Sequence, residues 1–113
     1  MTRYRVMYWK EIPVQIQVDG HDGQVSRELD PRFQKGVDAI AVFDGSIGTD
    51  EYLTGWEWGP YIEATGSKES VSSAIAEYYN HSFPVDFVTK IRDLYLTGNR
   101  DPSPGSIDQW CTG

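Results

Sequence analysis

Apolar and polar residues alternate along the N-terminal part of the chain, and this alternation predicts three β-strands. Aromatic and aliphatic residues alternate with basic ones over residues 3–9, and aliphatic residues alternate with amides over residues 13–19. Because neighbouring side chains of a strand point to opposite faces of a sheet, the aliphatic residues share one face. Alternation resumes over residues 24–29, after a turn sequence with two glycines at 20–23, which indicates a hairpin.

The first two predicted strands are separated by a turn or bulge at residues 10–12. Pro13 follows directly. Because proline has no N–H to donate to a neighbouring strand, it is tolerated at a strand start, an edge or a bulge. We therefore expect the chain to bend immediately after Trp9.

Helical spacing of apolar residues first occurs after Asp30. Aspartate is a favourable N-cap, and Pro31 suits the first helical position because the N–H that it lacks would have no partner there. We expect this helix to end near Phe43, where turn residues follow. Gly36 lies inside it, and we expect this glycine to let the helix pack closely on the sheet.

Two more helices are predicted in the second half of the chain. One is capped by Ser67 and is expected to break at residues 80–82. The other begins at Phe83 and Pro84 and ends before Gly98, a residue suited to the position after a helix C-terminus.

A fourth strand is predicted over residues 56–64, where Gly59 and Pro60 require a bulge or an edge position. The preceding residues 47–54 are expected to form a loop with room for one helical turn, capped by Thr49.

The order of these elements predicts an α+β fold, in which a mainly antiparallel sheet of about four strands carries about three helices on one face. A chain of 113 residues has room for one hydrophobic core. We assign a single domain to residues 1–100 and an extended C-terminal tail to residues 101–113. In the tail, Ile107 and Trp110 are the large apolar residues available for docking.

Charge and composition disfavour several classes of function. The net charge of −7 argues against nucleic acid and anionic membrane surfaces as partners. No apolar run reaches the roughly 18 residues that a membrane span needs, and no signal-peptide core follows the basic N-terminus, so we expect a cytoplasmic protein. The single cysteine, Cys111, excludes an internal disulfide and a cysteine-rich metal site.

The first candidate site is the sequence Trp9-Lys10-Glu11, which lies just before Pro13. An exposed aromatic residue beside charges of both signs at a strand bend is typical of a binding edge, since bulges often lie near functional sites. The alternative is structural: Trp9 packs on a neighbouring helix, and the bulge only shapes the sheet.

Trp56 and Trp58 form the second candidate site. Being two residues apart in a strand, they face the same side, and Tyr61 follows closely. If one of the tryptophans is exposed, it can anchor a protein partner, because tryptophan is enriched among interface hot spots. Otherwise both belong to the core.

Acidic residues gather around the glycine-rich loop that follows the first predicted helix: Asp44, Asp50, Glu51 and Glu57. Their spacing does not match a calcium-binding loop, and neither a nucleophile nor a positioned histidine accompanies them, as acid–base catalysis would require. We therefore favour a solvated acidic loop and predict no catalytic residue, no metal site and no cofactor.

Several segments resemble a bacterial family named virulence factor. The resemblance covers most of residues 3–105 and is carried by residues 7–15, 29–33, 50–53, 56, 83–84 and 91–92. In longer relatives, of the conserved virulence factor C type, the resemblance implies that this domain is joined to a NifU-like scaffold segment and helical repeats. We find neither in this sequence, so no iron–sulfur role is transferred to its residues. Stand-alone members are often encoded near corrinoid-dependent methyltransferase components, which implies an accessory role.

The preferred hypothesis is a non-enzymatic accessory or protein-interaction module of a cytoplasmic bacterial system. It docks on a protein partner through Trp9, Lys10, Glu11, Trp56 and Trp58.

The competing hypothesis is a protein that handles a small molecule or cofactor, enzymes included, linked to corrinoid or one-carbon methyl transfer. The aromatic residues would then stack on a ring, and Lys10, Asp50 and Glu51 would fix its polar groups. A deep pocket lined by these residues would favour this hypothesis, and a flat surface would favour a protein partner. A stability or assembly factor without a discrete site is the third alternative.

Overall fold

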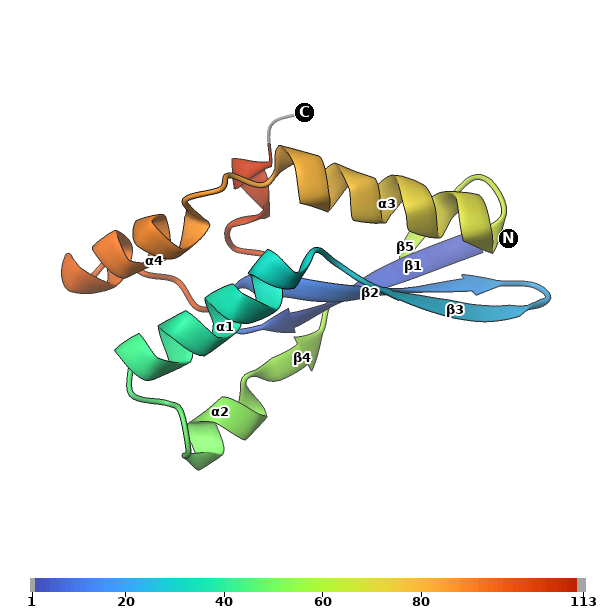
Figure 1. Cartoon of the computed structure of the whole chain (residues 1–113). Helices are drawn as coiled ribbons and strands as arrows, with labels where there is room; N and C mark the ends of the chain where they lie inside the picture. Colours follow the sequence, from blue (N-terminus) through green and yellow to red (C-terminus); the bar gives the residue numbers. More distant parts are fainter. Residues whose placement is uncertain (1, 112–113) are drawn as a thin grey trace.

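The computed structural model describes residues 2–111 and contains an antiparallel sheet with helices packed against it (Figure 1). The strands are β1 (Thr2–Trp9), β2 (Ile12–Gly20), β3 (Gly23–Glu28), β4 (Trp56–Trp58) and β5 (Ile62–Ala64). The helices are α1 (Pro31–Phe43), α2 (Asp50–Thr54), α3 (Lys68–Ser82) and α4 (Phe87–Leu96), followed by a 3-10 turn, η1 (Asp108–Trp110). This arrangement confirms the predicted α+β fold.

The strand order in the sheet is β3-β2-β1-β4, and β5 also pairs with β1. β4 and β5 come from the predicted fourth strand, which is divided between Trp58 and Ile62, so the sheet has five strands. Gly59 lies at the division: its N–H donates to the carbonyl oxygen of Val6 at 2.8 Å, and a Cβ there would lie 3.0 Å from the Tyr8 ring. The glycine therefore interrupts the strand while both halves stay against β1.

A two-residue turn, Lys10-Glu11, joins β1 to β2. Lys10 has a φ of 50°, a left-handed backbone conformation that is uncommon for a residue other than glycine. The strand pairing shifts by one residue between Met7 and Tyr8, so that Pro13 lies opposite Tyr8 at a bulge. The predicted bend is thus confirmed, and the proline lies where a strand tolerates one.

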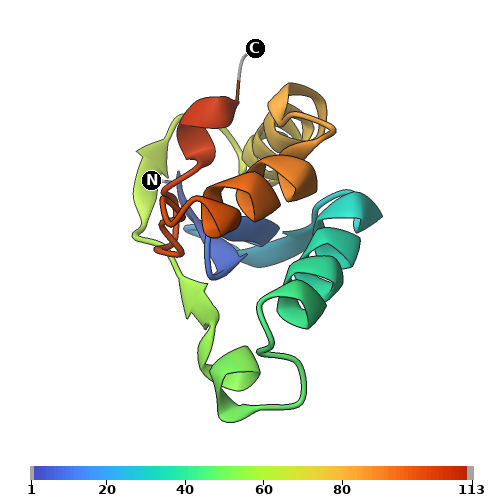
Figure 2. The ribbon, with the colours of Figure 1, turned by 90° about the vertical axis from the view of Figure 1, so that its left-hand side faces the viewer.

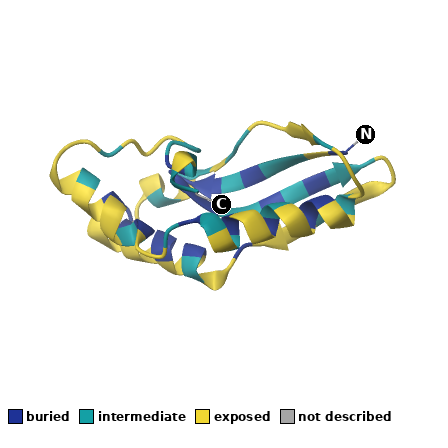
Figure 3. Cartoon of the chain, turned by 90° about the horizontal axis from the view of Figure 1, so that it is seen from above, coloured by how far each residue is buried: buried dark blue, intermediate teal, exposed yellow. Residues whose placement is uncertain are grey.

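The two faces of the sheet have different surroundings. Side chains alternate along β1, so Val6 and Tyr8 point to one face, and Met7 and Trp9 point to the other. α3 lies along the first face, while α1 and α4 pack on each other and extend the helical layer beyond the strands (Figures 1 and 3). The short helix α2 lies beside β4 at the same end (Figure 2). Part of the second face is therefore left with partly exposed side chains.

Aromatic packing joins α1 to α4. The ring of Phe33 lies 5.3 Å from that of Phe83 and 5.5 Å from that of Phe87, measured between centroids. A Cβ at Gly36 would lie 2.5 Å from Cζ of Phe87, so the glycine is what allows the two helices to approach. Our prediction that Gly36 packs on the sheet is therefore wrong, because it faces a helix.

The connection between α3 and α4 also differs from the prediction. α3 continues through residues 80–82, and α4 begins at Phe87 instead of Phe83. Phe83 is the C-cap residue of α3 and is buried. The guanidinium of Arg32 donates to the carbonyl oxygens of Phe83 and Pro84 at 3.0 and 3.1 Å. These bonds fix the connection against the start of α1 and give Arg32 a structural role.

The C-terminal segment lies against the rest of the chain. Ile107 is 4% exposed and belongs to the core, and Trp110 packs against that core. Oδ2 of Asp108 accepts hydrogen bonds from the hydroxyls of Tyr8, at 2.5 Å, and Tyr79, at 3.2 Å. The segment is therefore fixed to both β1 and α3.

Candidate functional site

The Lys10-Glu11 turn lies within a cluster of charged side chains. The backbone N–H of Lys10 donates to the carbonyl oxygen of Gly55 at 2.8 Å, which fixes the turn beside the end of α2. Its Nζ donates to Oδ2 of Asp44 at 2.9 Å and to Oε2 of Glu51 at 2.6 Å. One lysine side chain thus connects the turn to the end of α1 and to α2.

Glu11 is buried in this cluster and is neutralised by Arg100. Its carboxylate accepts two hydrogen bonds, from Nε of Arg100 at 2.7 Å and from Nη2 at 2.8 Å, and its side chain is only 1% exposed. Nη1 of Arg100 also donates to Asp44 at 2.9 Å. Such a bidentate pair fixes geometry as well as charge. Glu11 therefore anchors the C-terminal segment to the turn instead of presenting a charge to a partner.

Asp44 accepts hydrogen bonds at both of its carboxylate oxygens. Oδ2 receives Lys10 and Arg100, and Oδ1 receives the backbone N–H of Ser46 at 3.0 Å and its hydroxyl at 2.6 Å. Burial by itself raises the pKa of Asp44, but the hydrogen bonds from Lys10, Ser46 and Arg100 outweigh it and lower the pKa to about 2. The expected solvated acidic loop is therefore wrong for Asp44.

Trp9 is fully buried, with 0% of its surface exposed. Its Nε1 donates to the carbonyl oxygen of Tyr52 in α2 at 2.9 Å, and the two rings lie 5.7 Å apart. A Cβ at Gly55 would lie 2.8 Å from Nε1, so the chain after α2 passes directly over the indole. The expectation of an exposed aromatic residue at the bend is wrong, and the alternative, a tryptophan packed on a neighbouring helix, is the arrangement found.

Trp56 and Trp58 point to the same side of the sheet as Met7 and Trp9, because these residues are cross-strand partners. Both are half-buried. Trp56 joins the aromatic group under α2, its ring lying 6.2 Å from that of Tyr52. Trp58 lies outside that group, two residues after Trp56 in β4.

Trp58 belongs instead to a row of arginine and aromatic side chains, which we call the arginine–aromatic face. The guanidinium carbon of Arg5 lies 4.1 Å from the Trp58 ring centroid and 4.8 Å from that of Tyr61, and Nε of Arg5 donates to Gln17 at 2.8 Å. The guanidinium of Arg3 lies 3.8 Å from the same Tyr61 ring. The face is defined by Arg3, Arg5, Met7, Trp58 and Tyr61.

The remaining predicted acidic residues lie at the surface. Asp50 and Glu51 occupy the first turn of α2, and Glu57 lies in β4; all three are exposed. Of the predicted set, the fold brings Trp9, Lys10 and Glu51 together around α2. Asp50 is exposed at the start of α2, and Glu11 is buried against Arg100.

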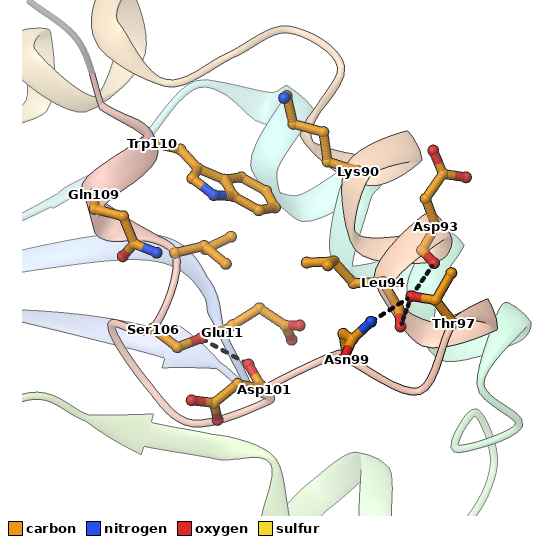
Figure 4. Close-up of a pocket in the computed structure, with 11 residues that line it drawn as sticks. Glu11, Lys90, Asp93, Leu94, Thr97, Asn99, Asp101, Ser106, Gln109 and Trp110 are labelled. Carbon is orange, nitrogen blue, oxygen red and sulfur yellow. Dashed lines mark hydrogen bonds between the residues drawn. The ribbon is translucent and has the colours of Figure 1, made fainter.

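A pocket of about 680 Å³ opens between α4 and the C-terminal segment (Figure 4). Its walls include Leu94 from α4 and Ile107 and Trp110 from the C-terminal segment. Glu11 is the predicted site residue that reaches it. The pocket therefore differs from the aromatic pocket that a small-molecule site built from Trp9, Trp56 and Trp58 would require.

The protonation behaviour of the buried groups favours no nucleophile. Burial raises the pKa of Tyr8 and of Tyr79 above the ordinary tyrosine value, and Asp108 adds to both shifts. Burial also raises the pKa of Asp108 and of the Cys111 thiol. Activation of a hydroxyl or thiol would require a shift in the opposite direction.

Residues 2–111 show neither a metal-binding cluster nor a membrane-spanning helix. These residues contain no group of three or more histidine, cysteine, aspartate and glutamate side chains placed to hold a metal ion. Within the same range, no helix combines the length and apolar composition needed to cross a membrane.

Sequence reasoning missed Arg100 and Asp108, which complete the buried polar groups of the turn and of β1. Arg100 is 89 positions away from Glu11, and Asp108 is 100 positions away from Tyr8. No local pattern marks either residue, since each lies in a segment rich in proline, glycine and serine.

Comparison with known proteins places the chain in one family. The family model described as "Virulence factor" matches residues 7–91, a range that begins within β1 at Met7, includes the turn and ends halfway along α4. No curated protein and no solved structure matched the chain. Arg100 and the walls of the pocket in the C-terminal segment lie beyond the matched region. Because the match spans most of its length, the chain belongs to the virulence factor family.

Proposed function

We propose that the chain is a non-enzymatic protein-interaction module that docks on an acidic segment of a partner protein through the arginine–aromatic face. The observation that carries the proposal is the stacking of Arg5 and Arg3 on Trp58 and Tyr61. An accessory role in a bacterial system agrees with this proposal.

The composition of this face supports a role in binding. Tryptophan, tyrosine, arginine and methionine are the residues most enriched in protein interfaces, and the first three dominate hot spots. Tyr61 is 37% exposed, while Arg5 and Trp58 are half-buried. Anchors that are already partly packed lose little conformational freedom on binding, which favours affinity.

The stacked arginines support a carboxylate-bearing partner. A guanidinium that stacks through its planar surface keeps its edge N–H groups for hydrogen bonds, and this fork matches a carboxylate in a bidentate manner. The guanidinium of Arg3 also lies 3.4 Å from the carboxylate of Asp19. A partner carboxylate therefore has to compete with Asp19 for Arg3. Arg5, whose Nε is held by an amide, is therefore the main anchor.

The experiment compares binding by matched variants. Affinity purification from the native cell identifies the partner, and calorimetry with the purified partner then measures its affinity. We expect Arg5→Ala and Trp58→Ala to weaken binding by about thirtyfold, the effect of losing a hot spot of roughly 2 kcal/mol. Arg5→Lys should weaken binding nearly as much, because lysine keeps the charge but lacks the planar fork.

Arg92→Ala is the matched control, since Arg92 is an exposed arginine on α4. It should bind within about twofold of the wild type, in line with other residues outside an interface. Unchanged affinity in Arg5→Ala and Trp58→Ala would refute the proposed face. Recovery of no specific partner by the wild type would refute the interaction function itself.

Small-molecule handling is the second candidate function. Lys10 and Glu51 do line a hollow of about 480 Å³, together with Asp44 and Arg100, but these groups already pair with one another. The link to corrinoid or one-carbon methyl transfer can be tested by thermal shift with folates and corrinoids. A ligand at about 100 times its dissociation constant should stabilise the chain by roughly 2.7 kcal/mol. The pocket at α4, at about 680 Å³, is the larger alternative for a ligand.

A further inference from the structure

β3 lies at one border of the sheet and pairs with β2 alone, because the strand order is β3-β2-β1-β4. The hairpin of β2 and β3 extends beyond the start of β1 (Figure 1). Every residue of β3 is exposed except Val25, which is half-buried. A border strand carries a row of backbone N–H and C=O groups that can pair with a further strand.

The register of the hairpin determines which of these groups point away from β2. The N–H of Leu29, directly after β3, donates to the carbonyl oxygen of Val14 at 3.0 Å, so Leu29 bonds inward. Because the direction of hydrogen bonding alternates from one residue of an antiparallel strand to the next, the odd-numbered residues bond to β2 and the even-numbered ones point outward. The outward groups of β3 belong to Gln24, Ser26 and Glu28.

These outward backbone groups have no hydrogen-bond partner within residues 2–111. The next outward N–H along the chain, that of Asp30, donates to Oδ1 of Asn80 in α3 at 2.8 Å. α3 therefore closes the edge after β3 and leaves β3 itself open.

The opposite border of the sheet is protected against such pairing. β4 and β5 have three residues each and are divided at Gly59 and Pro60. Short strands and prolines at an edge prevent the addition of another strand. β3 instead has six residues in unbroken register with β2, and it contains neither proline nor lysine. β3 is therefore the border that is open to another strand.

The sequence of β3 fits a second copy of itself in antiparallel order. Pairing centred on Ser26 places Gln24 opposite Glu28 of the second copy, so that all outward groups join in about six hydrogen bonds. Pairing centred on Arg27 or Glu28 would place like charges opposite each other, which is unfavourable. Pairing centred on Gln24 or Val25 would carry Glu28 past the end of the other β3. The register centred on Ser26 is therefore favoured.

The side chains that face each other in this register are also compatible. Nε2 of Gln24 donates one N–H to Asp19 at 2.9 Å, and its second N–H is available for Glu28 of the second copy. On the side of α3, the methylene stem of Arg27 lies opposite Val25 and can cover its exposed part.

We propose that two copies of the chain associate through their β3 strands, antiparallel and centred on Ser26, and thereby form one continuous sheet. Gln17 lies opposite Ser26 in the hairpin and holds Arg5, so the two arginine–aromatic faces lie on the same side of that sheet. The inference rests on the edge of β3 and does not depend on the proposed function.

Sedimentation equilibrium of the full chain over a range of concentrations tests the association. A single pair of short strands is a small interface, so we expect monomer and dimer to exchange at high micromolar concentration. Ser26→Pro removes an outward N–H without removing a bond to β2, so its circular dichroism should match that of the wild type. It should weaken the dimer by about thirtyfold, because two hydrogen bonds are lost. A wild-type chain that stays monomeric up to millimolar concentration, or a dimer that persists in Ser26→Pro, would overturn the proposal.

A disulfide between the two copies tests the centre of the pairing. In a Cys111→Ser background, Ser26→Cys places two cysteines opposite each other with their Cα atoms about 5.5 Å apart, within the range for a disulfide. Oxidation should then link the dimer covalently. Glu57→Cys, at an exposed position of β4 on the opposite border, is the matched control and should remain largely monomeric. Equal yields of linked dimer in the two variants would refute the centre.

Two substitutions of Gln24 should change the affinity in opposite directions. Gln24→Lys places an ammonium opposite Glu28 of the second copy and should tighten the dimer by about threefold, whereas Gln24→Glu places like charges there and should weaken it by about threefold. Equal affinities in these two variants would refute the register. Arg5→Ala should dimerise like the wild type, so failure of this inference and failure of the proposed function can be told apart.

Discussion

Trp9 and Trp58 lie close together on the same side of the sheet, yet their surroundings are opposite. Met7 pairs with Trp58 and Trp9 with Trp56 across β1 and β4, so Trp58 lies diagonally across from Trp9 on the same face. α2 covers Trp9 completely, whereas Trp58 keeps part of its surface and stacks with Arg5. Whether a tryptophan is buried or partly exposed is thus decided by the element that crosses over it, not by the residue type.

The charged residues of the two regions differ in the same manner. Lys10, Glu11, Asp44 and Arg100 pair with one another and are largely shielded from solvent. Arg5 of the arginine–aromatic face donates to the side-chain amide of Gln17 and stacks on two aromatic rings. None of these contacts pairs its positive charge with a carboxylate. The charges of the turn therefore stabilise the fold, whereas the guanidinium of Arg5 is left available for the binding role that we propose for the face. Three measurements test this contrast.

Trp9→Ala should have the largest effect. Removing a fully buried tryptophan leaves a cavity under α2 and unpairs the Tyr52 carbonyl, so we expect a loss of about 3–5 kcal/mol in the free energy of unfolding. Trp58→Ala is the matched comparison, with an expected loss of about 1 kcal/mol. Urea denaturation followed by circular dichroism measures both. Equal losses in the two variants would abolish the distinction between the regions.

Glu11→Ala should cause the second-largest loss in the free energy of unfolding. It leaves Arg100 buried with only Asp44 as a partner, and we expect a loss of about 3 kcal/mol. The double variant Glu11→Ala, Arg100→Leu should lose less than the two single variants combined, because the unpaired charge is then absent. Additive losses in this double-mutant cycle would show that the pair is not coupled.

Acid should destabilise the turn in a defined range of pH. The folded pKa of Asp44, about 2, lies below its ordinary value of 3.8. Its contribution is therefore fully present above pH 3.8 and is lost as the pH falls toward 2. We expect the free energy of unfolding to fall more steeply in the wild type than in Asp44→Asn over this interval. Parallel curves would contradict the paired state of Asp44.

Local signals in the sequence predicted the elements that depend on neighbouring residues. Asp30 and Ser67 cap their helices as expected, accepting the N–H groups of Arg32 and Ser70, and Gly98 adopts a φ of 76° after α4. Each of these signals lies within a few residues of the structure that it predicts. The same holds for the bend before Pro13.

The remaining features depend on contacts between distant parts of the chain. The start of α4 was misplaced because Arg32, far upstream, holds the carbonyls of the preceding segment. The burial of Trp9 depends on the path taken by α2, and that of Glu11 on an arginine near the other end of the chain. Of the arginine–aromatic face, the sequence predicted Trp58 as a site residue. The pairing of β1 with β4 and β5 is what brings Arg3, Arg5 and Tyr61 to the same face, and that pairing joins distant parts of the chain.

The Glu11–Arg100 pair also bears on how the chain folds as it is synthesised. The turn between β1 and β2 is synthesised 89 positions before Arg100, so the carboxylate of Glu11 lacks its partner until residue 100 has emerged. A buried charge without a partner is strongly unfavourable, so we expect the N-terminal hairpin to stay open or hydrated until then. The turn can therefore close only after Arg100 has been synthesised, when the segment after α4 can pack over it.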